Sequence, residues 1–185
     1  MEALKRLLEG NSRFAAGRPE TPRRGSKRRI ETAEGQLPYA VILTCADSRV
    51  PPEIIFDEGI GDLFVVRVAG NVAGDLVTGS IEYAVRHLSV TLVVVLGHNN
   101  CGAVNAACSD GVPWGHTGSF IDAIRPVIKR SDISDGDDFV NANVQNVVET
   151  LKNSEPILKS LVDKDRLSIL GAHYDLTSGK VTLLE

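Results

Sequence analysis

The chain of 185 residues has few cysteines, no excess of basic charge and no long apolar run. Its three cysteines are too few for a disulfide framework, and they favour a reducing compartment in which thiols bind metals. The 20 Lys and Arg against 24 Asp and Glu give a net charge of −4, so there is no basic field for nucleic acid. No segment approaches the ~20 apolar residues of a membrane span, and the first residues lack the apolar stretch of a signal peptide. We therefore expect a cytoplasmic protein that binds neither nucleic acid nor membrane.

Apolar runs of strand length alternate with helical patterns, which is typical of an α/β fold with a parallel sheet. With 43% hydrophobic residues, the chain is long enough for a single domain with a substantial core. The expected strands are 39–45, 63–69, 91–97, 167–174 and 180–184, and the expected helices are 3–14, 78–88, 102–108 and 140–161. The sequence thus predicts a mainly parallel central sheet flanked by helices. A hairpin at Thr177-Ser178-Gly179 makes the last strand an antiparallel edge strand.

The first 34 residues are expected to form a helical arm, and residues 35–185 the α/β domain. Residues 3–14 place Leu4, Leu7 and Leu8 on one stripe, which indicates an amphipathic helix. Residues 18–27 are rich in arginine and proline without any period, so we expect an exposed, solvated arm or a contact with a partner subunit. The irregular segment 109–118 predicts no regular structure.

Two short motifs follow buried-looking strands. CADSR at Cys45–Arg49 follows YAVILT, and HNNCG at His98–Gly102 follows TLVVVLG. Ligands bind beyond the carboxyl ends of parallel strands, so the two motifs are expected at one edge of the sheet. Cys45, Cys101, His98 and Asp47 offer two thiols, an imidazole and a carboxylate, which is a donor set for Zn²⁺. A zinc with three protein ligands and one exchangeable position activates water, so we expect a hydrolytic or hydrating enzyme.

The other cysteine and histidines carry no such signal. A lone cysteine is usually packed in a core, and Cys108 has no motif around it, so we expect it to be inert. Nothing in the context of His87, His116 or His173 marks one of them as a ligand or proton carrier.

The spacing of C-x-D-x-R and H-x-x-C, some fifty residues apart, resembles the signature of the β-class carbonic anhydrases. The segments GDLFVVRVAGNV, GSIEYAV and VVVLGHNNCGAV are also similar to that family, so the resemblance covers nearly the whole chain. It implies that Cys45, His98 and Cys101 bind zinc and that Asp47 and Arg49 form a catalytic pair. The implied activity is that of a carbonate dehydratase, the reversible hydration of carbon dioxide to bicarbonate and a proton by zinc-bound hydroxide.

The resemblance also implies a way to open and close the site. In an open state Arg49 holds Asp47 off the metal, and the carboxylate orients the nucleophile. In a closed state Asp47 becomes the fourth zinc ligand. The sequence does not decide which state prevails at neutral pH.

The pocket residues resemble those of the plant-like branch of the family. Gln36 would donate its amide to a substrate oxygen, Phe64 and Tyr83 would wall a small apolar slot, and the backbone N–H of Gly102 would bind the anion. The family further implies at least a homodimer, in which the N-terminal helix crosses onto its neighbour and the subunits share the pocket walls. Whether dimers pair into tetramers stays open.

Other functions are compatible with the same ligands. Carbonyl sulfide and carbon disulfide hydrolases are similar to this family and keep the zinc ligands, although Gln36 favours an oxygen-bearing substrate. A non-catalytic zinc or redox sensor would release its metal when Cys45 and Cys101 are oxidised. A purely structural site would keep Asp47 bound permanently, and Arg49 argues against that because such an Asp needs no releasing partner.

Overall fold

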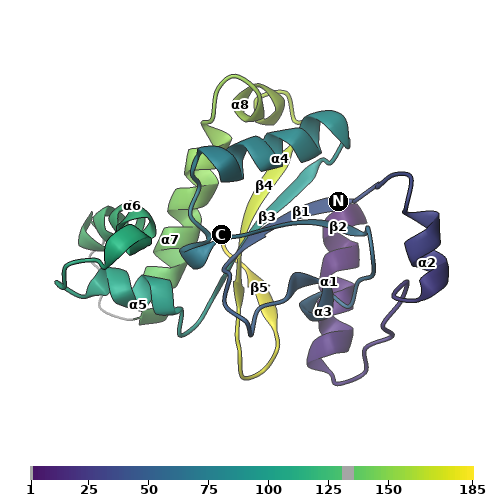
Figure 1. Cartoon of the computed structure of the whole chain (residues 1–185), viewed down its shortest axis with the longest axis horizontal. Helices are drawn as coiled ribbons and strands as arrows, with labels where there is room; N and C mark the ends of the chain where they lie inside the picture. Colours follow the sequence, from purple (N-terminus) through teal and green to yellow (C-terminus); the bar gives the residue numbers. More distant parts are fainter. Residues whose placement is uncertain (1, 131–135) are drawn as a thin grey trace.

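A five-stranded sheet runs through the centre of the molecule, with helices on both faces (Figure 1). The computed structural model describes residues 2–130 and 136–185. The strands, in spatial order, are β2 (Leu63–Arg67), β1 (Ala40–Thr44), β3 (Leu92–His98), β4 (Ser168–Tyr174) and β5 (Val181–Leu183). The first four are parallel, and β5 pairs antiparallel with β4. The predicted α/β fold with an antiparallel edge strand is confirmed.

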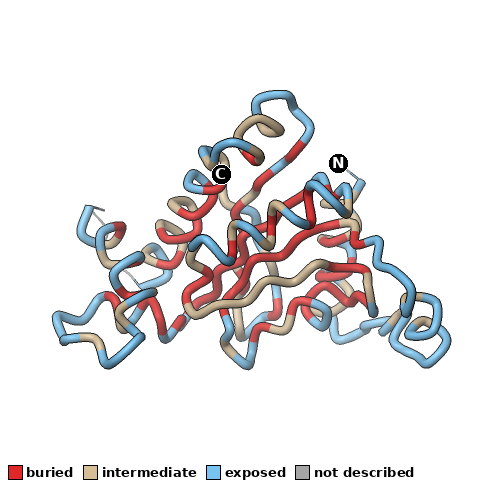
Figure 2. The backbone as a smooth tube through the Cα atoms, turned by 45° about the horizontal axis from the view of Figure 1, so that its top comes forward, coloured by how far each residue is buried: buried red, intermediate tan, exposed pale blue. Residues whose placement is uncertain are grey.

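The central strands are apolar throughout because both of their faces are covered. Val41 and Leu43 of β1 pack on one face in a core with α4 (Asp75–His87) and α7 (Gly136–Lys152). Ile42 faces the other side and packs near Leu7 and Phe56, under α1 (Glu2–Ala15) and α3 (Pro52–Ile55). Figure 2 shows the result as buried strands wrapped by half-exposed helices.

The helices follow the sequence pattern only in part. The remaining ones are α2 (Ser26–Glu31), α5 (Gly102–Cys108), α6 (Gly118–Arg130) and α8 (Leu158–Val162), with 3-10 turns at Ala69–Asn71 and Gly115–Thr117. The single long helix expected over 140–161 is wrong: α7 ends at Lys152 and α8 follows, because Pro156 lacks the N–H that a continuous helix needs. The sequence pattern also missed α2, α3 and α6, and α6 contains Pro126, a residue that usually argues against a helix interior. Among the described residues, none of the helices is long and apolar enough to cross a membrane.

The arginine-rich arm is exposed, as expected, but Arg23 and Arg24 bind the body of the same chain. Three buried carboxylates, Asp57, Glu58 and Asp62, lie between α3 and β2. Arg23 donates to Glu58 at 2.6 Å and to Asp62 at 2.7 Å, and Arg6 of α1 donates to Glu58 at 2.6 Å. Buried carboxylates that lose their partners are costly, so these contacts fix the arm on the domain. The contact of residues 1–34 with a second copy stays a prediction.

The pKa of Asp57 shows that the pairing outweighs burial. Burial alone raises the pKa of this carboxyl, but hydrogen bonds from Arg13 and from the backbone N–H groups of Glu20 and Thr21 bring it below its ordinary value. A lowered pKa means that the pairing stabilises the fold above the ordinary value of about 3.9. That stabilisation is lost as the pH falls through the lowered value.

We predict that Arg23→Ala lowers the free energy of unfolding, because it removes a partner from two buried carboxylates. Breaking a fully buried pair costs about 3–5 kcal/mol, but the Arg23 side chain is 39% exposed, so we expect about 2 kcal/mol. The measurement is urea denaturation, with the exposed Arg18→Ala of the same segment as control. Equal stabilities for the two variants would show that the arm is only loosely attached.

Candidate metal centre

Three potential metal ligands meet at the carboxyl edge of the sheet. Cys45 directly follows β1, His98 ends β3, and Cys101 immediately precedes α5. Because β1 and β3 are adjacent and parallel, their carboxyl ends lie side by side. One ligand atom from each of the three residues lies within 4.8 Å of the others, and all three residues are buried. The sequence prediction that these residues meet is confirmed.

His98 presents one ring nitrogen to this cluster. Its Nδ1 lies 2.8 Å from the backbone oxygen of Asn99, and since a carbonyl only accepts, Nδ1 carries the proton. The Nε2 atom is buried and has no hydrogen-bond partner within residues 2–130 and 136–185. An unsatisfied buried acceptor is costly, and a metal cation would satisfy it. Two sulfurs and one imidazole nitrogen therefore fit zinc.

The two thiols form an unequal pair. Cys101 Sγ donates to Cys45 Sγ across 3.9 Å, and this bond is the main reason that the pKa of Cys45 is lowered. A hydrogen bond from the backbone N–H of Gly70 acts in the same direction. The pKa of Cys101 is raised, first because it donates to Cys45 and second because it is buried. A thiolate and a thiol that share one proton exchange it readily for a cation.

Asp47 and Arg49 pair beside the cluster. Arg49 Nε donates to Asp47 Oδ1 at 2.9 Å, Arg49 Nη2 donates to Oδ2 at 2.7 Å, and the backbone N–H of Arg49 adds a third bond. The Arg49 side chain holds the pKa of Asp47 far below its ordinary value, so the carboxylate is ionised. Asp47 Oδ2 lies 3.9 Å from His98 Nε2, so the carboxylate is next to the cluster while it stays paired with Arg49.

Arg67 supports the same loop and is a residue that the sequence reasoning missed. It ends β2, and its guanidinium donates to the backbone oxygen of Cys45 at 3.1 Å and to that of Asp47. One arginine thereby fixes the main chain of both the ligand and the neighbouring carboxylate. A lone basic residue inside the apolar run LFVVRVA is the signal that could have identified it.

Gly70 lies beside Cys45 in a position that favours glycine. Its backbone N–H lies 3.4 Å from Cys45 Sγ, and its φ of +68° is a conformation that favours glycine. A Cβ at this position would lie 2.6 Å from Ile124 Cδ1. The buried amide of Asn143 holds the Gly70 carbonyl at 2.9 Å. Through Asn143, α7 thus fixes Gly70, whose backbone N–H donates to Cys45 Sγ.

The expected pocket residues are not at this edge, apart from Gly102, which directly follows Cys101 as the first residue of α5. Gln36 precedes β1, and a strand of five residues spans about 16 Å, so it lies toward the opposite, amino edge. Phe64 pairs with Val41 near the start of β2, and its ring centroid is 6.3 Å from that of Tyr83 on α4. The structure brings Phe64 and Tyr83 together but leaves both away from the metal ligands of their own chain. Their roles stay predictions.

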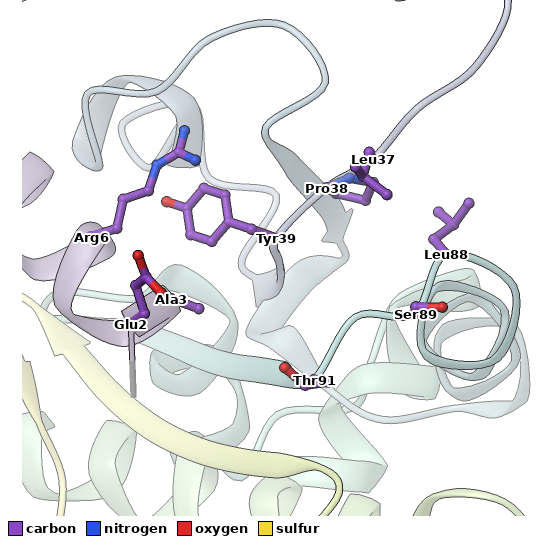
Figure 3. Close-up of a pocket in the computed structure, with 9 residues that line it drawn as sticks. All are labelled: Glu2, Ala3, Arg6, Leu37, Pro38, Tyr39, Leu88, Ser89 and Thr91. Atoms are coloured by element: carbon purple, nitrogen blue, oxygen red, sulfur yellow. The ribbon is translucent and has the colours of Figure 1, made fainter.

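The amino edge also has a cavity of about 520 Å³, which is distinct from the metal centre (Figure 3). It is lined by Glu2, Ala3, Arg6, Leu37, Pro38, Tyr39, Leu88, Ser89 and Thr91. Arg6 stacks on the Tyr39 ring at 4.0 Å, and both side chains bind Glu58. Arg6, the one cation among these lining residues, is therefore engaged in holding α1 on the domain.

Cys108 differs from its expectation. It is exposed at the end of α5 rather than packed in the core, and all three cysteines are free thiols. It lies outside the cluster of ligand atoms.

Comparison with known proteins places the chain among well-defined relatives. The family described as carbonic anhydrase matches residues 40–181. The chain is 45% identical over 188 residues to carbonic anhydrase 2 of Mycobacterium tuberculosis, covering 98% of this chain and 91% of the relative. It is 42% identical to a carbonic anhydrase of Mycolicibacterium smegmatis, with the same coverage of both chains.

Solved structures share the fold as well. A tetrameric β-carbonic anhydrase of Sordaria macrospora aligns with a TM-score of 0.79 and 26% identity, covering 100% of this chain and 98% of that one. A Coccomyxa β-carbonic anhydrase, solved in complex with acetazolamide, aligns with a TM-score of 0.78 and 31% identity, covering 98% of this chain and 86% of that one. These alignments span the sheet and the ligand cluster.

We predict that the purified protein carries about one zinc per chain and that Cys45→Ser, His98→Ala or Cys101→Ser loses it, because three ligands define the site. Elemental analysis after dialysis gives the zinc content. Cys108→Ser is the matched control, since it removes a thiol outside the cluster and should retain full zinc. Full zinc in Cys101→Ser would refute the ligand assignment.

Proposed function

The chain belongs to the β-class carbonic anhydrases, and from this premise we propose that it catalyses the reversible hydration of carbon dioxide to bicarbonate and a proton, with zinc as cofactor. One observation carries the proposal: three zinc-type ligand atoms lie within 4.8 Å of one another beside an ionised carboxylate. The ligands would be Cys45, His98 and Cys101. A zinc ion held there supplies a nucleophile at neutral pH, because it lowers the pKa of a coordinated water toward ~7.

Asp47 acts as the acceptor that orients the nucleophile. Its carboxylate is ionised and lies 3.9 Å from His98 Nε2, so it is close enough to accept a hydrogen bond from a group bound at the cluster. Arg49 holds both carboxylate oxygens and so keeps Asp47 from turning to the metal. This arrangement corresponds to the open state and supports a catalytic site over a permanently closed structural one. Arg67 fixes the loop that carries both Cys45 and Asp47.

A second copy of the chain would complete the substrate pocket. β2 is an edge strand that is only half-buried, and Tyr83 on the neighbouring α4 is 47% exposed. Two copies related by a two-fold axis beside this edge would run antiparallel, so the amino edge of one would lie near the metal edge of the other. Gln36, Phe64 and Tyr83 of one copy would then reach the metal centre of its partner. We therefore propose at least a homodimer. The tetrameric Sordaria relative supports the further proposal that two dimers pair into a tetramer.

The three free cysteines support the cytoplasmic location that the sequence favours, because thiols persist in a reducing compartment. Substrate and product on this proposal are carbon dioxide and bicarbonate, and Phe64 and Tyr83, whose ring centroids are 6.3 Å apart, would form one apolar wall of the pocket.

We predict that zinc-loaded protein hydrates carbon dioxide in a stopped-flow assay, and that Asp47→Asn or Arg49→Ala retains zinc but loses roughly 10²–10⁴ in rate. Both residues orient the nucleophile without being needed to hold the metal. The exposed Arg29→Ala of α2 is the control and should keep the wild-type rate.

Wild-type rates in Arg49→Ala would contradict the role of the pair. Hydrolysis of carbonyl sulfide or carbon disulfide without hydration of carbon dioxide would favour those substrates, and zinc binding with neither activity would favour a sensor.

A further inference from the structure

Asn99, which lies in the spacer between two metal ligands, has all of its polar groups engaged. Its backbone oxygen accepts from His98 Nδ1 at 2.8 Å, and its backbone N–H donates to the backbone oxygen of Tyr174 at 3.3 Å. Its side-chain nitrogen donates to Asp175 Oδ2 at 2.9 Å, and its side-chain oxygen accepts from the backbone N–H of Leu176 at 2.9 Å. The residue is 9% exposed. Asn99 thus ties the metal-binding histidine to the connection between β4 and β5.

That connection is itself firmly anchored. Asp175 accepts a second hydrogen bond from the backbone N–H of Ser178 at 2.6 Å. Asn11 of α1, which is 4% exposed, donates to the carbonyl of Gly179 and accepts from the backbone N–H of Val181, each at 2.8 Å. The contacts of Asn99 are therefore to a fixed part of the domain.

The loop after His98 needs such an anchor. β3 ends at His98, and the chain then turns sharply, with Asn100 at a φ of +53°. The backbone oxygen of Asn100 also accepts from Arg49 at 3.3 Å. Two carbonyls depend on how this turn is held. The Asn99 carbonyl accepts from the ligand His98, and the Asn100 carbonyl accepts from Arg49, the partner of Asp47.

We propose that Asn99 is a positioning residue for the metal centre. Its side chain fixes the turn, the turn fixes the Asn99 carbonyl, and the carbonyl keeps the proton of His98 on Nδ1, so that Nε2 faces the metal. This inference rests on the proposed zinc site and adds the β4–β5 connection to it. Hydrogen-bond partners of metal-ligating histidines are typically worth a 10–100-fold change in metal affinity.

The test compares zinc affinities, measured by competition with a chromophoric chelator. Asn99→Ala should weaken zinc binding roughly 10–100-fold, whereas Asn105→Ala, an exposed asparagine on α5, should leave it unchanged. The absorption spectrum of the cobalt-loaded protein should also change in Asn99→Ala, because it reports the orientation of the imidazole around the metal.

A swapped double variant separates positioning from mere folding. In Asn99→Asp with Asp175→Asn, the amide at 175 can donate to the carboxylate at 99, while Leu176 and Ser178 keep their acceptors. The double variant should recover zinc affinity and the cobalt spectrum to near wild type, whereas Asn99→Asp alone places two carboxylates face to face and should bind zinc more weakly than the double variant.

Wild-type affinity and spectrum in Asn99→Ala, or no recovery in the double variant, would overturn the proposal. Zinc affinity is independent of turnover, so a chain that binds zinc but hydrates no carbon dioxide would contradict the proposed function alone. A wild-type chain that binds no zinc would contradict both.

Discussion

The parallel pairing of β1 with β3 is the constraint on which the metal centre depends. Thr44 pairs with Leu96, so Cys45 emerges one residue after this pair and His98 two residues after it. The hydroxyl of Thr44 donates to the carbonyl of Leu96 at 2.9 Å in the buried interior, which fixes the register next to the site. A slip of one residue would turn each side chain to the other face and separate the ligands.

Two sets of Arg–carboxylate pairs serve opposite purposes in this fold. The arm pairs bind carboxylates that are almost fully buried, and their loss would leave charges without solvent or partner. In the pair beside the metal ligands, the Arg49 side chain is 53% exposed and that of Asp47 is 16% exposed. Solvent can replace an exposed partner at little cost, so this pair contributes less to the stability of the fold than the arm pairs do. The arm carboxylates are thus almost fully buried, whereas Asp47 beside the metal ligands is more exposed.

The sequence predicts best where local pattern and topology coincide. Apolar runs that end in Cys45 and His98 predict both the strands and their meeting at one edge. What it misses are the long-range partners. Arg67 stands out in an apolar run, but the carbonyls that it binds leave no trace in the sequence. The side chain of Asn99 donates to that of Asp175, which lies 76 residues further along the chain.

The placement of Gln36 depends on the direction of β1 relative to the cluster, which motif matching alone does not reveal. Proline had opposite effects on two of the misjudged helices, because Pro156 ends a helix that periodicity extends, whereas Pro126 is tolerated inside α6.

In the proposed metal centre, two sulfurs and one imidazole are the protein ligands while Asp47 stays with Arg49. X-ray absorption on zinc-loaded protein at neutral pH measures this directly. We expect two sulfurs at about 2.3 Å, one imidazole nitrogen at about 2.0 Å and one further light atom. The same ligand sphere should persist in Asp47→Asn, because the carboxylate is not a ligand in this state. A single sulfur, or a fourth ligand that disappears in Asp47→Asn, would contradict it.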